Sequence, residues 1–317
     1  MQALGKQAFA KHTQRFPSAV SSSPRSSVRA MASKAHVCEP KWWTTDDVAV
    51  VTGANKGLGF ECARQLAGEA GFTTIVTARN EKAGQEAAES LRKTCGEQAC
   101  LDFHQLDISD KKSIETFKAW LQQKYGKLNV LVNNGAIAYK GSIFGPQEAR
   151  VTIDVNYHGT ADVTEALVPL MPTDGRSRVV TVASRAGLSS ILKSQQLKDR
   201  FLTAKGRADV DALVSEWLAS VEKGDYSAKG WPGSMYGVSK LAVNAYHRAL
   251  AKELESKRIM VNTCCPGYCA TDMSSHRGTS TAYDGARIFT WLATKPPQDF
   301  ESGGFWVYEN IGVKCPM

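Results

Sequence analysis

The 317-residue chain has no long hydrophobic run, and its first 38 residues contain no Asp or Glu. No stretch approaches the roughly eighteen uninterrupted apolar residues that suggest a transmembrane helix, so we expect no membrane span. The eight cysteines lack paired C-x-x-C spacing and a nearby histidine cluster, which argues against a zinc site, and we predict no metal. Most cysteines should be reduced thiols, with a Cys95–Cys100 pair as an alternative.

The missing acids make the N-terminus strongly basic. Residues 1–38 contribute six of the net +8 charges, which leaves +2 for the rest and argues against a nucleic-acid-binding surface. The same segment holds seven serines, a composition typical of an organelle transit peptide, and Val28-Arg29-Ala30-Met31 resembles a chloroplast processing site. We therefore predict that residues 1–45 are a chloroplast leader. A mitochondrial address, a cytoplasmic protein and a disordered arm without an address remain the alternatives.

Residues 46–317 alternate strand-like and helix-like segments, as expected of one α/β domain. Amphipathic stretches at 81–93, 110–124, 148–171 and 236–256 separate short apolar runs. This alternation predicts a Rossmann-type, doubly wound parallel sheet with helices on both faces. The seven predicted strands lie at about 48–52, 73–77, 99–105, 128–132, 177–183, 259–264 and 304–308.

One interval interrupts this alternation. Residues 188–233 are too long for an ordinary connection and carry helix-like pieces near 194–204 and 208–223, followed by Gly224, Gly230, Pro232 and Gly233. We predict an inserted helical segment here.

A glycine-rich turn follows the first predicted strand. The sequence Thr-Gly-Ala-Asn-Lys-Gly-Leu-Gly at 52–59 leads into a helix, and a strand, a glycine turn and a helix N-terminus together form a phosphate cradle. The spacing is G-x-x-x-G-x-G rather than the common G-x-G-x-x-G. The predicted cofactor contacts in this loop are Gly53, Asn55, Lys56, Gly57, Leu58 and Gly59.

The second strand indicates which dinucleotide is bound. It ends at Arg79, where enzymes that bind NAD usually carry an acid for the ribose 2′-hydroxyl. A guanidinium suits a 2′-phosphate, and Lys56 offers a second positive charge. Both residues indicate NADP(H), with a solvated surface arginine as the alternative.

Further candidates follow the later strands. Asp107 can accept the adenine amino group, Asn134 can brace a loop near the nicotinamide ribose, and Thr271 can bond the nicotinamide amide or the pyrophosphate. Pro266-Gly267 turns the chain over the cofactor. Ordinary turns and caps are the alternative for Asp107 and Pro266-Gly267.

A second group of residues indicates acid–base chemistry. Tyr236 and Lys240 are four apart at the start of a helix and share a face. A nearby ammonium stabilises phenolate, so we expect Lys240 to draw the Tyr236 pKa down from about 10 towards the range of a general acid. Ser184 can donate a hydrogen bond to the same substrate oxygen, and Asn156 can hold a water that connects Lys240 to solvent.

Together these residues resemble the short-chain dehydrogenase/reductase family, over roughly residues 47–310. Within it, the chain is similar to the monomeric NADPH-dependent carbonyl reductases. The matches are Ala54-Asn55-Lys56-Gly57, Thr77-Ala78-Arg79, Gly230-Trp231-Pro232, Tyr236-Gly237-Val238-Ser239-Lys240 and Cys264-Cys265-Pro266-Gly267-Tyr268, together with the long insertion. One departure is Gly135-Ala136, where the family has Ala-Gly.

The resemblance implies an enzyme that reduces a ketone, aldehyde or quinone with NADPH. It makes Tyr236 the general acid, Ser184 the carbonyl-orienting group, Lys240 a ribose ligand that tunes Tyr236, and Asn156 a support of the proton relay. It also implies a monomer. An NADP(H)-binding regulator without turnover and an alcohol dehydrogenase working in the oxidative direction are the alternatives. The implied substrate contacts, equally suited to a core or lid, are Ile137, Tyr139, Trp231, Met235 and Tyr268.

Overall fold

The computed structural model describes residues 41–299, 301–307 and 314–315, so most of the predicted leader lies outside the described residues. The last five residues of that leader nevertheless contact the domain. The indole N–H of Trp42 donates to the Thr294 carbonyl at 2.8 Å, and Trp43 stacks on Phe72 with ring centroids 5.6 Å apart. Residues 41–45 therefore pack with the compact unit that begins at Lys41, and the predicted extent of the leader, residues 1–45, stays a prediction.

The centre of the fold is one sheet of order β3-β2-β1-β4-β5-β6-β7-β8. Its first seven strands pair in parallel and β8 pairs antiparallel to β7, so the predicted doubly wound parallel sheet of about seven strands is confirmed and extended by one short strand. The strands are β1 Val48–Val51, β2 Thr73–Ala78, β3 Leu101–Gln105, β4 Val130–Asn133, β5 Arg178–Val182, β6 Met260–Cys265, β7 Phe305–Val307 and β8 Lys314–Cys315.

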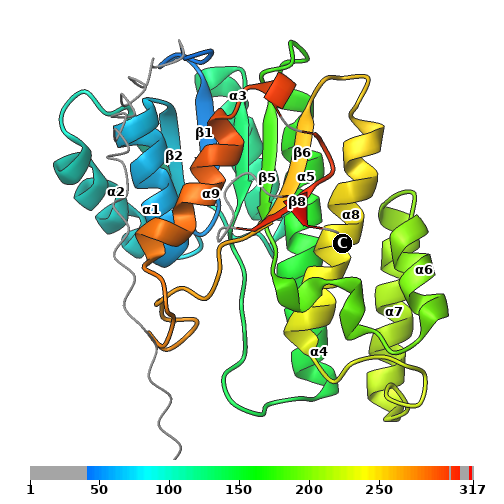
Figure 1. Cartoon of the computed structure of the whole chain (residues 1–317). Helices are drawn as coiled ribbons and strands as arrows, with labels where there is room; N and C mark the ends of the chain where they lie inside the picture. The colour runs from blue at the N-terminus through cyan, green and yellow to red at the C-terminus, as the bar shows by residue number, and fades with distance from the viewer. Residues whose placement is uncertain (1–40, 300, 308–313, 316–317) are drawn as a thin grey trace, which may run out of the picture. The chain divides into compact units, whose positions relative to one another are not determined.

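Helices cover both faces of this sheet (Figure 1). Successive residues of a strand point to opposite faces of the sheet and pack into two hydrophobic cores. Val48 and Val50 of β1 lie in the core with α3, α5 and α8. Ala49 and Val51 lie in the core with α1, α2 and α9. The helices are α1 Gly57–Arg64, α2 Glu81–Cys95, α3 Lys111–Tyr125, α4 Pro146–Ile153, α5 Thr160–Leu167, α6 Gln195–Thr203, α7 Arg207–Lys223, α8 Met235–Glu253 and α9 Ala282–Thr294. Shorter turns are the π-helices η1 Gln65–Ala70 and η2 Asp154–Gly159, and the 3-10 helices η3 Val168–Leu170, η4 Arg185–Gly187, η5 Ser189–Ile191 and η6 Pro297–Asp299.

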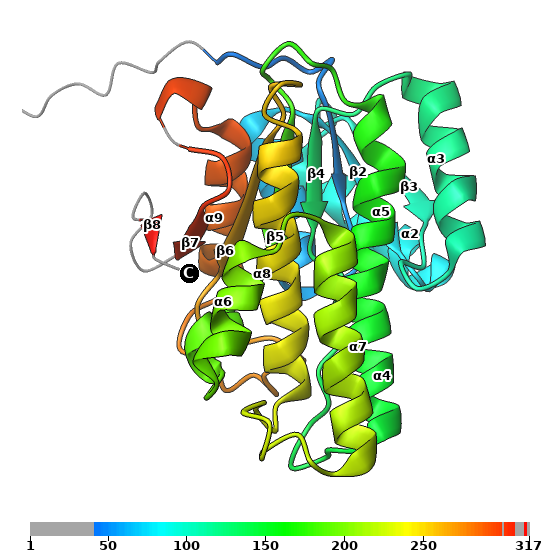
Figure 2. The same cartoon turned by 90° about the vertical axis from the view of Figure 1, so that its right-hand side faces the viewer.

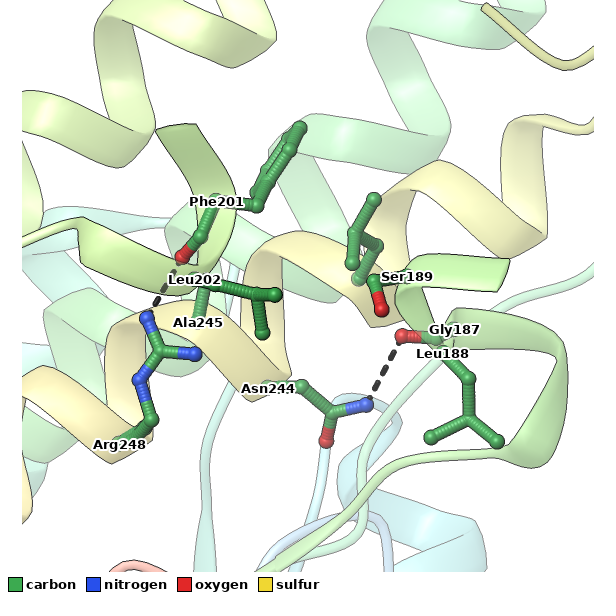
Figure 3. A pocket seen from close by; sticks show the side chains of 9 residues that line it. Gly187, Leu188, Ser189, Phe201, Leu202, Asn244, Ala245 and Arg248 are labelled. Atoms are coloured by element: carbon green, nitrogen blue, oxygen red, sulfur yellow. Dashed lines mark hydrogen bonds between the residues drawn. The ribbon is translucent and has the colours of Figure 1, made fainter. Parts of the chain in front are cut away.

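The predicted insertion forms α6 and α7, which lie on the outer side of α4 and α8 (Figure 2). A set of ion pairs fixes α7 to α5, because the Arg207 guanidinium bonds Asp162 at 2.6 Å and Glu165 at 2.5 Å. Hydrogen bonds join η4 and α6 to α8: Asn244 donates to the Gly187 carbonyl at 3.0 Å, and Arg248 donates to the Phe201 carbonyl at 2.6 Å (Figure 3).

Six cysteines are free thiols, namely Cys62, Cys95, Cys100, Cys264, Cys265 and Cys269, so the alternative of a disulfide between Cys95 and Cys100 is wrong. Cys95 instead lies with its sulfur 3.7 Å from the Arg64 carbonyl. Within the described ranges, the helices are all too short or too polar to cross a membrane.

Candidate active site

A cleft of about 560 Å³ opens at the carboxyl ends of the strands. Its walls come from the segments that directly follow β1, β2, β3, β4 and β6, where a doubly wound sheet places its ligands. The predicted residues on these walls are Gly53, Asn55, Lys56, Gly57, Leu58, Arg79, Asp107, Asn134, Ile137 and Thr271.

The glycine loop needs glycine at three positions for two reasons, backbone conformation and close packing. Gly53 and Gly57 have positive φ angles, 62° and 59°, which side-chain-bearing residues rarely adopt. A β-carbon at Gly59 would come within 2.5 Å of both the Gly53 carbonyl oxygen and the Asn134 amide nitrogen. A β-carbon at Gly57 would instead project beside Thr271, 3.5 Å from its methyl group, into the cleft. The loop therefore leaves an open cradle at the start of α1, which fits a pyrophosphate.

The two predicted cations, Arg79 and Lys56, both line this cleft but differ in whether they form an ion pair. Arg79 forms no ion pair with the part of the chain that the structure describes, and its side chain is exposed. The Lys56 ammonium is 2.7 Å from a carboxylate oxygen of Asp272, a residue of the loop after β6. Of these two cations, Arg79 is thus available to a ligand and Lys56 already has a partner.

Asn134 and Asp107 both make hydrogen bonds that shape the cleft. The Asn134 amide donates to the Thr52 carbonyl at 2.9 Å and to the Gly53 carbonyl at 3.1 Å, so it braces the glycine loop. Asp107 accepts hydrogen bonds from the backbone N–H and the hydroxyl of Ser109. These bonds form a turn, as in the alternative interpretation of Asp107. Asp107 still lines the cleft beside Ile108.

The loop after β6 begins with the predicted Pro266-Gly267 turn. Gly267 has a φ of 84°, so the sharp turn depends on glycine. Neither residue lines the cleft, but the turn leads to Thr271, which does. The Thr271 carbonyl accepts the backbone N–H of His276 at 2.8 Å, which folds the loop back on itself.

Helix α8 brings the acid–base residues together. Ser234 caps its start by accepting the Gly237 N–H at 3.0 Å, so Tyr236 lies in the first turn and Lys240 one turn later. The buried Lys240 ammonium donates to the Val182 carbonyl at 2.6 Å, and Val182 is the last residue of β5. Two residues after it, the Ser184 hydroxyl is hydrogen-bonded to the Tyr236 phenol.

The Tyr236 pKa is not lowered as the sequence suggested. Burial raises the pKa of Tyr236 to about 12, and the hydrogen bond with Ser184 offsets only part of this. The Lys240 ammonium points to a backbone carbonyl and lies 5.7 Å from the centre of the phenol ring. Burial also lowers the Lys240 pKa to about 8. Desolvation therefore outweighs the attraction that we expected from Lys240.

Asn156 connects the cleft to α8. It lies in the π-helix η2, a form of helix that is frequent at functional sites, and it is fully buried. Its amide oxygen accepts the Ile137 N–H at 2.8 Å, and its amide nitrogen donates to the Ile137 carbonyl at 2.9 Å and to the Ser239 hydroxyl at 3.0 Å. These bonds hold the cleft wall against the helix of Tyr236 and Lys240.

The predicted substrate residues fall into two groups. Ile137 lines the cleft, and Tyr139 and Tyr268 expose 39% and 52% of their surface. Trp231 is 1% exposed and packs its ring edge-on against Phe201 of α6, and Met235 is also buried. The core alternative therefore describes Trp231 better than a substrate contact does.

The sequence did not single out two residues that shape the site. Asp272 pairs with Lys56, and the only local signal is an acid next to Thr271. Gly187 packs directly on α8, since a β-carbon there would lie 2.4 Å from the Lys240 carbonyl carbon. Among the described residues, no group of three or more His, Cys, Asp or Glu side chains lies close enough together to hold a metal ion.

Known proteins are similar to this chain in sequence and in fold. Carbonyl reductase (NADPH) 3 of Rattus norvegicus is 38% identical over 272 residues, which cover 83% of this chain and 96% of that protein. Carbonyl reductase (NADPH) 1 of Homo sapiens is 36% identical over 271 residues, with 83% and 96% covered. The solved structure of salutaridine reductase from Papaver somniferum has a TM-score of 0.75 and 28% identity, and covers 82% of this chain and 99% of its own.

The family profile described as short chain dehydrogenase matches residues 47–195 and 220–281. Its two segments contain the glycine loop, Arg79, Asn156, Ser184, Tyr236 and Lys240, and the gap between them falls inside the insertion. The chain belongs to the short-chain dehydrogenase family.

Proposed function

We propose that this protein reduces the carbonyl group of a ketone, aldehyde or quinone to an alcohol with NADPH as the reductant. The hydrogen-bonded pair of Ser184 and Tyr236 hydroxyls above a buried Lys240 ammonium carries this proposal. The sequence identity to proteins named as NADPH carbonyl reductases supports it.

The cofactor site is assigned to the cleft. The cradle at Gly57 faces the pyrophosphate, Arg79 and Lys56 supply charge for the 2′-phosphate, and Asp107 is assigned to the adenine side. The full set of proposed cofactor ligands is Gly53, Asn55, Lys56, Gly57, Leu58, Gly59, Arg79, Asp107, Asn134, Lys240 and Thr271, and the Pro266-Gly267 turn positions Thr271 among them. NADPH bound here supplies the hydride for the carbonyl carbon.

The protein's own residues supply the proton and the orientation. Ser184 donates a hydrogen bond to the substrate oxygen, and Tyr236 donates the proton to the same oxygen. Asn156 fixes the cleft wall relative to α8 and so sets the distance between the cofactor and Tyr236. Substrate enters beside Ile137, Tyr139 and Tyr268, whose apolar surfaces favour an apolar carbonyl compound.

The raised Tyr236 pKa favours the reductive direction. Reduction needs a protonated phenol, and a pKa of about 12 keeps Tyr236 protonated at neutral pH. Alcohol oxidation needs the phenolate, which burial disfavours. This supports reduction over the alternative of an alcohol dehydrogenase.

A monomer and a chloroplast address complete the proposal. The insertion supports a monomer because α6 and α7 cover the outer side of α4 and α8 and leave that helical face unavailable to a second copy (Figure 2). The basic, acid-free and serine-rich composition of residues 1–38 supports the address.

The decisive variant is Tyr236→Phe. It removes only the phenol hydroxyl, so we expect turnover of a panel of quinones, aldehydes and ketones to be lost while NADPH still binds with unchanged affinity. Tyr283→Phe is the control, because Tyr283 is 39% exposed on α9 and should keep full activity. Full activity of the Tyr236→Phe protein would show that another group delivers the proton.

A further inference from the structure

An ion pair crosses the cofactor cleft. The Lys56 ammonium, at the start of α1, lies 2.7 Å from the carboxylate of Asp272, which is 216 positions away in the sequence. Both side chains line the cleft and are more than half exposed. The pair thus joins the glycine loop to the loop after β6 across the opening of the cleft.

The loop that carries Asp272 rests on the glycine loop in a strained conformation. The Thr271 methyl group lies 3.5 Å from the position of a β-carbon on Gly57. Ser275 and His276 both have positive φ angles, 53° and 58°, which cost about 1 kcal/mol or more each outside glycine. The second carboxylate oxygen of Asp272 lies 2.9 Å from His276 Nε2, so the same carboxylate holds this strained turn and Lys56 together.

The ion pair engages the Lys56 ammonium, which the 2′-phosphate of the cofactor would also bind. Arg79 is available to a 2′-phosphate, but Lys56 already has an anionic partner. The hydrogen bond from Lys56 also holds the pKa of the Asp272 carboxyl below its usual range, so the partner stays charged. A 2′-phosphate that engages Lys56 must therefore compete with Asp272.

We propose that Asp272 is a specificity-determining residue that competes with the 2′-phosphate of NADPH for the Lys56 ammonium. This inference rests on the cofactor site proposed above. NADH has no 2′-phosphate and leaves the pair intact, so Asp272 weakens the binding of NADPH and not of NADH. Because exposed ion pairs are individually weak, the expected effect is about a two- to fivefold change in the Kd of NADPH.

The test is equilibrium binding of NADPH and NADH, followed by nucleotide fluorescence at low salt, to the wild-type protein and to Asp272→Asn, Lys56→Met and the double variant. We expect D272N to lower the Kd of NADPH about two- to fivefold and to leave the Kd of NADH unchanged. K56M should raise the Kd of NADPH about tenfold or more, because it removes a charge-assisted contact. In the K56M background, D272N should leave the Kd of NADPH unchanged, because the ammonium for which Asp272 and the 2′-phosphate compete is then absent.

Asp299→Asn is the matched control. Asp299 also pairs with a lysine, Lys295, at 3.0 Å, but it is not a wall of the cleft, so this variant should bind both dinucleotides as the wild type does. Unchanged or weaker NADPH binding by D272N would overturn the inference. So would equal tightening of NADH, or a D272N effect that persists without Lys56. A wild-type protein that binds neither dinucleotide would instead overturn the cofactor site itself, and the inference with it.

Discussion

Gly187 lies against the backbone of Lys240, so closely that a β-carbon on Gly187 would come within 2.4 Å of the Lys240 carbonyl carbon and 2.6 Å of its Cβ. Gly187 ends the turn that begins at Ser184, and Lys240 lies one helical turn after Tyr236. The contact therefore sets how closely the serine turn approaches the helix that carries the tyrosine and the lysine.

Gly187→Ala should damage catalysis more than cofactor binding. The added methyl group must push the serine turn away from α8, which separates Ser184 from Tyr236. We expect kcat to fall about 10- to 100-fold and the free energy of unfolding to fall by about 1–3 kcal/mol. Steady-state kinetics and urea denaturation measure the two effects.

Gly206→Ala is the matched control for this substitution. A β-carbon at Gly206 meets no atom within 4 Å, and the φ of Gly206 is −171°, an extended conformation that alanine adopts. This variant should keep wild-type kcat, and its free energy of unfolding should fall by less than about 1 kcal/mol, because Gly206 is the N-cap of α7. If G187A also behaved like the wild type, the close contact with Lys240 would have no role in placing Ser184.

The residues that the sequence revealed are those whose chemistry depends on local spacing. The glycine loop, the arginine after β2 and the Tyr236–Lys240 pair follow strands or share a helical face, and these relationships are visible in a short stretch of sequence. Gly187 and Asp272 matter because of partners that are distant in the sequence, Lys240 and Lys56. The raised Tyr236 pKa was also beyond prediction, because it depends on burial and on the direction in which Lys240 points.

The Gly135-Ala136 departure from the family motif should be nearly neutral. Positive φ angles among the described non-glycine residues occur at Arg258, Ser275 and His276, so Ala136 is not strained. A β-carbon on Gly135 would lie 3.2 Å from the end of the Ile108 side chain, which can shift slightly. We expect the G135A/A136G double variant to bind NADPH within about threefold of the wild-type Kd. A larger change, measured by the same fluorescence titration, would show that the exchanged methyl group alters the cofactor site.

The segment at residues 41–45 should stabilise the domain. Trp42 covers the buried Arg178, whose guanidinium carbon lies 4.6 Å from the centre of the indole ring, and burial lowers the Arg178 pKa to about 10. A chain that starts at Asp46 should be about 1–3 kcal/mol less stable to urea than one that starts at Lys41. Trp42→Phe keeps an aromatic face but loses the bond to Thr294, so it should cost only about 1 kcal/mol. Equal stability of the two shortened chains would show that residues 41–45 do not stabilise the domain.

His247 should make stability depend on pH. It is buried behind β5, where its Nδ1 lies 2.9 Å from the Val243 carbonyl and its Nε2 lies 2.8 Å from the Thr181 hydroxyl. A carbonyl only accepts hydrogen bonds, so Nδ1 carries the hydrogen and Nε2 accepts from Thr181. Burial lowers the pKa of His247 from 6.5 to about 4 in the folded protein.

The sign of this effect follows from proton uptake. Between pH 6.5 and 4, His247 is protonated in the unfolded chain but not in the folded protein. The free energy of unfolding therefore falls as the pH falls through this window, by up to about 3 kcal/mol. Urea denaturation of the wild type and of His247→Gln at several pH values measures it. The variant should lose less stability across the window than the wild type does, whatever its own stability at neutral pH. Equal pH slopes for the wild type and H247Q would mean that the buried imidazole is protonated in the folded state, with Thr181 then accepting a hydrogen bond from Nε2.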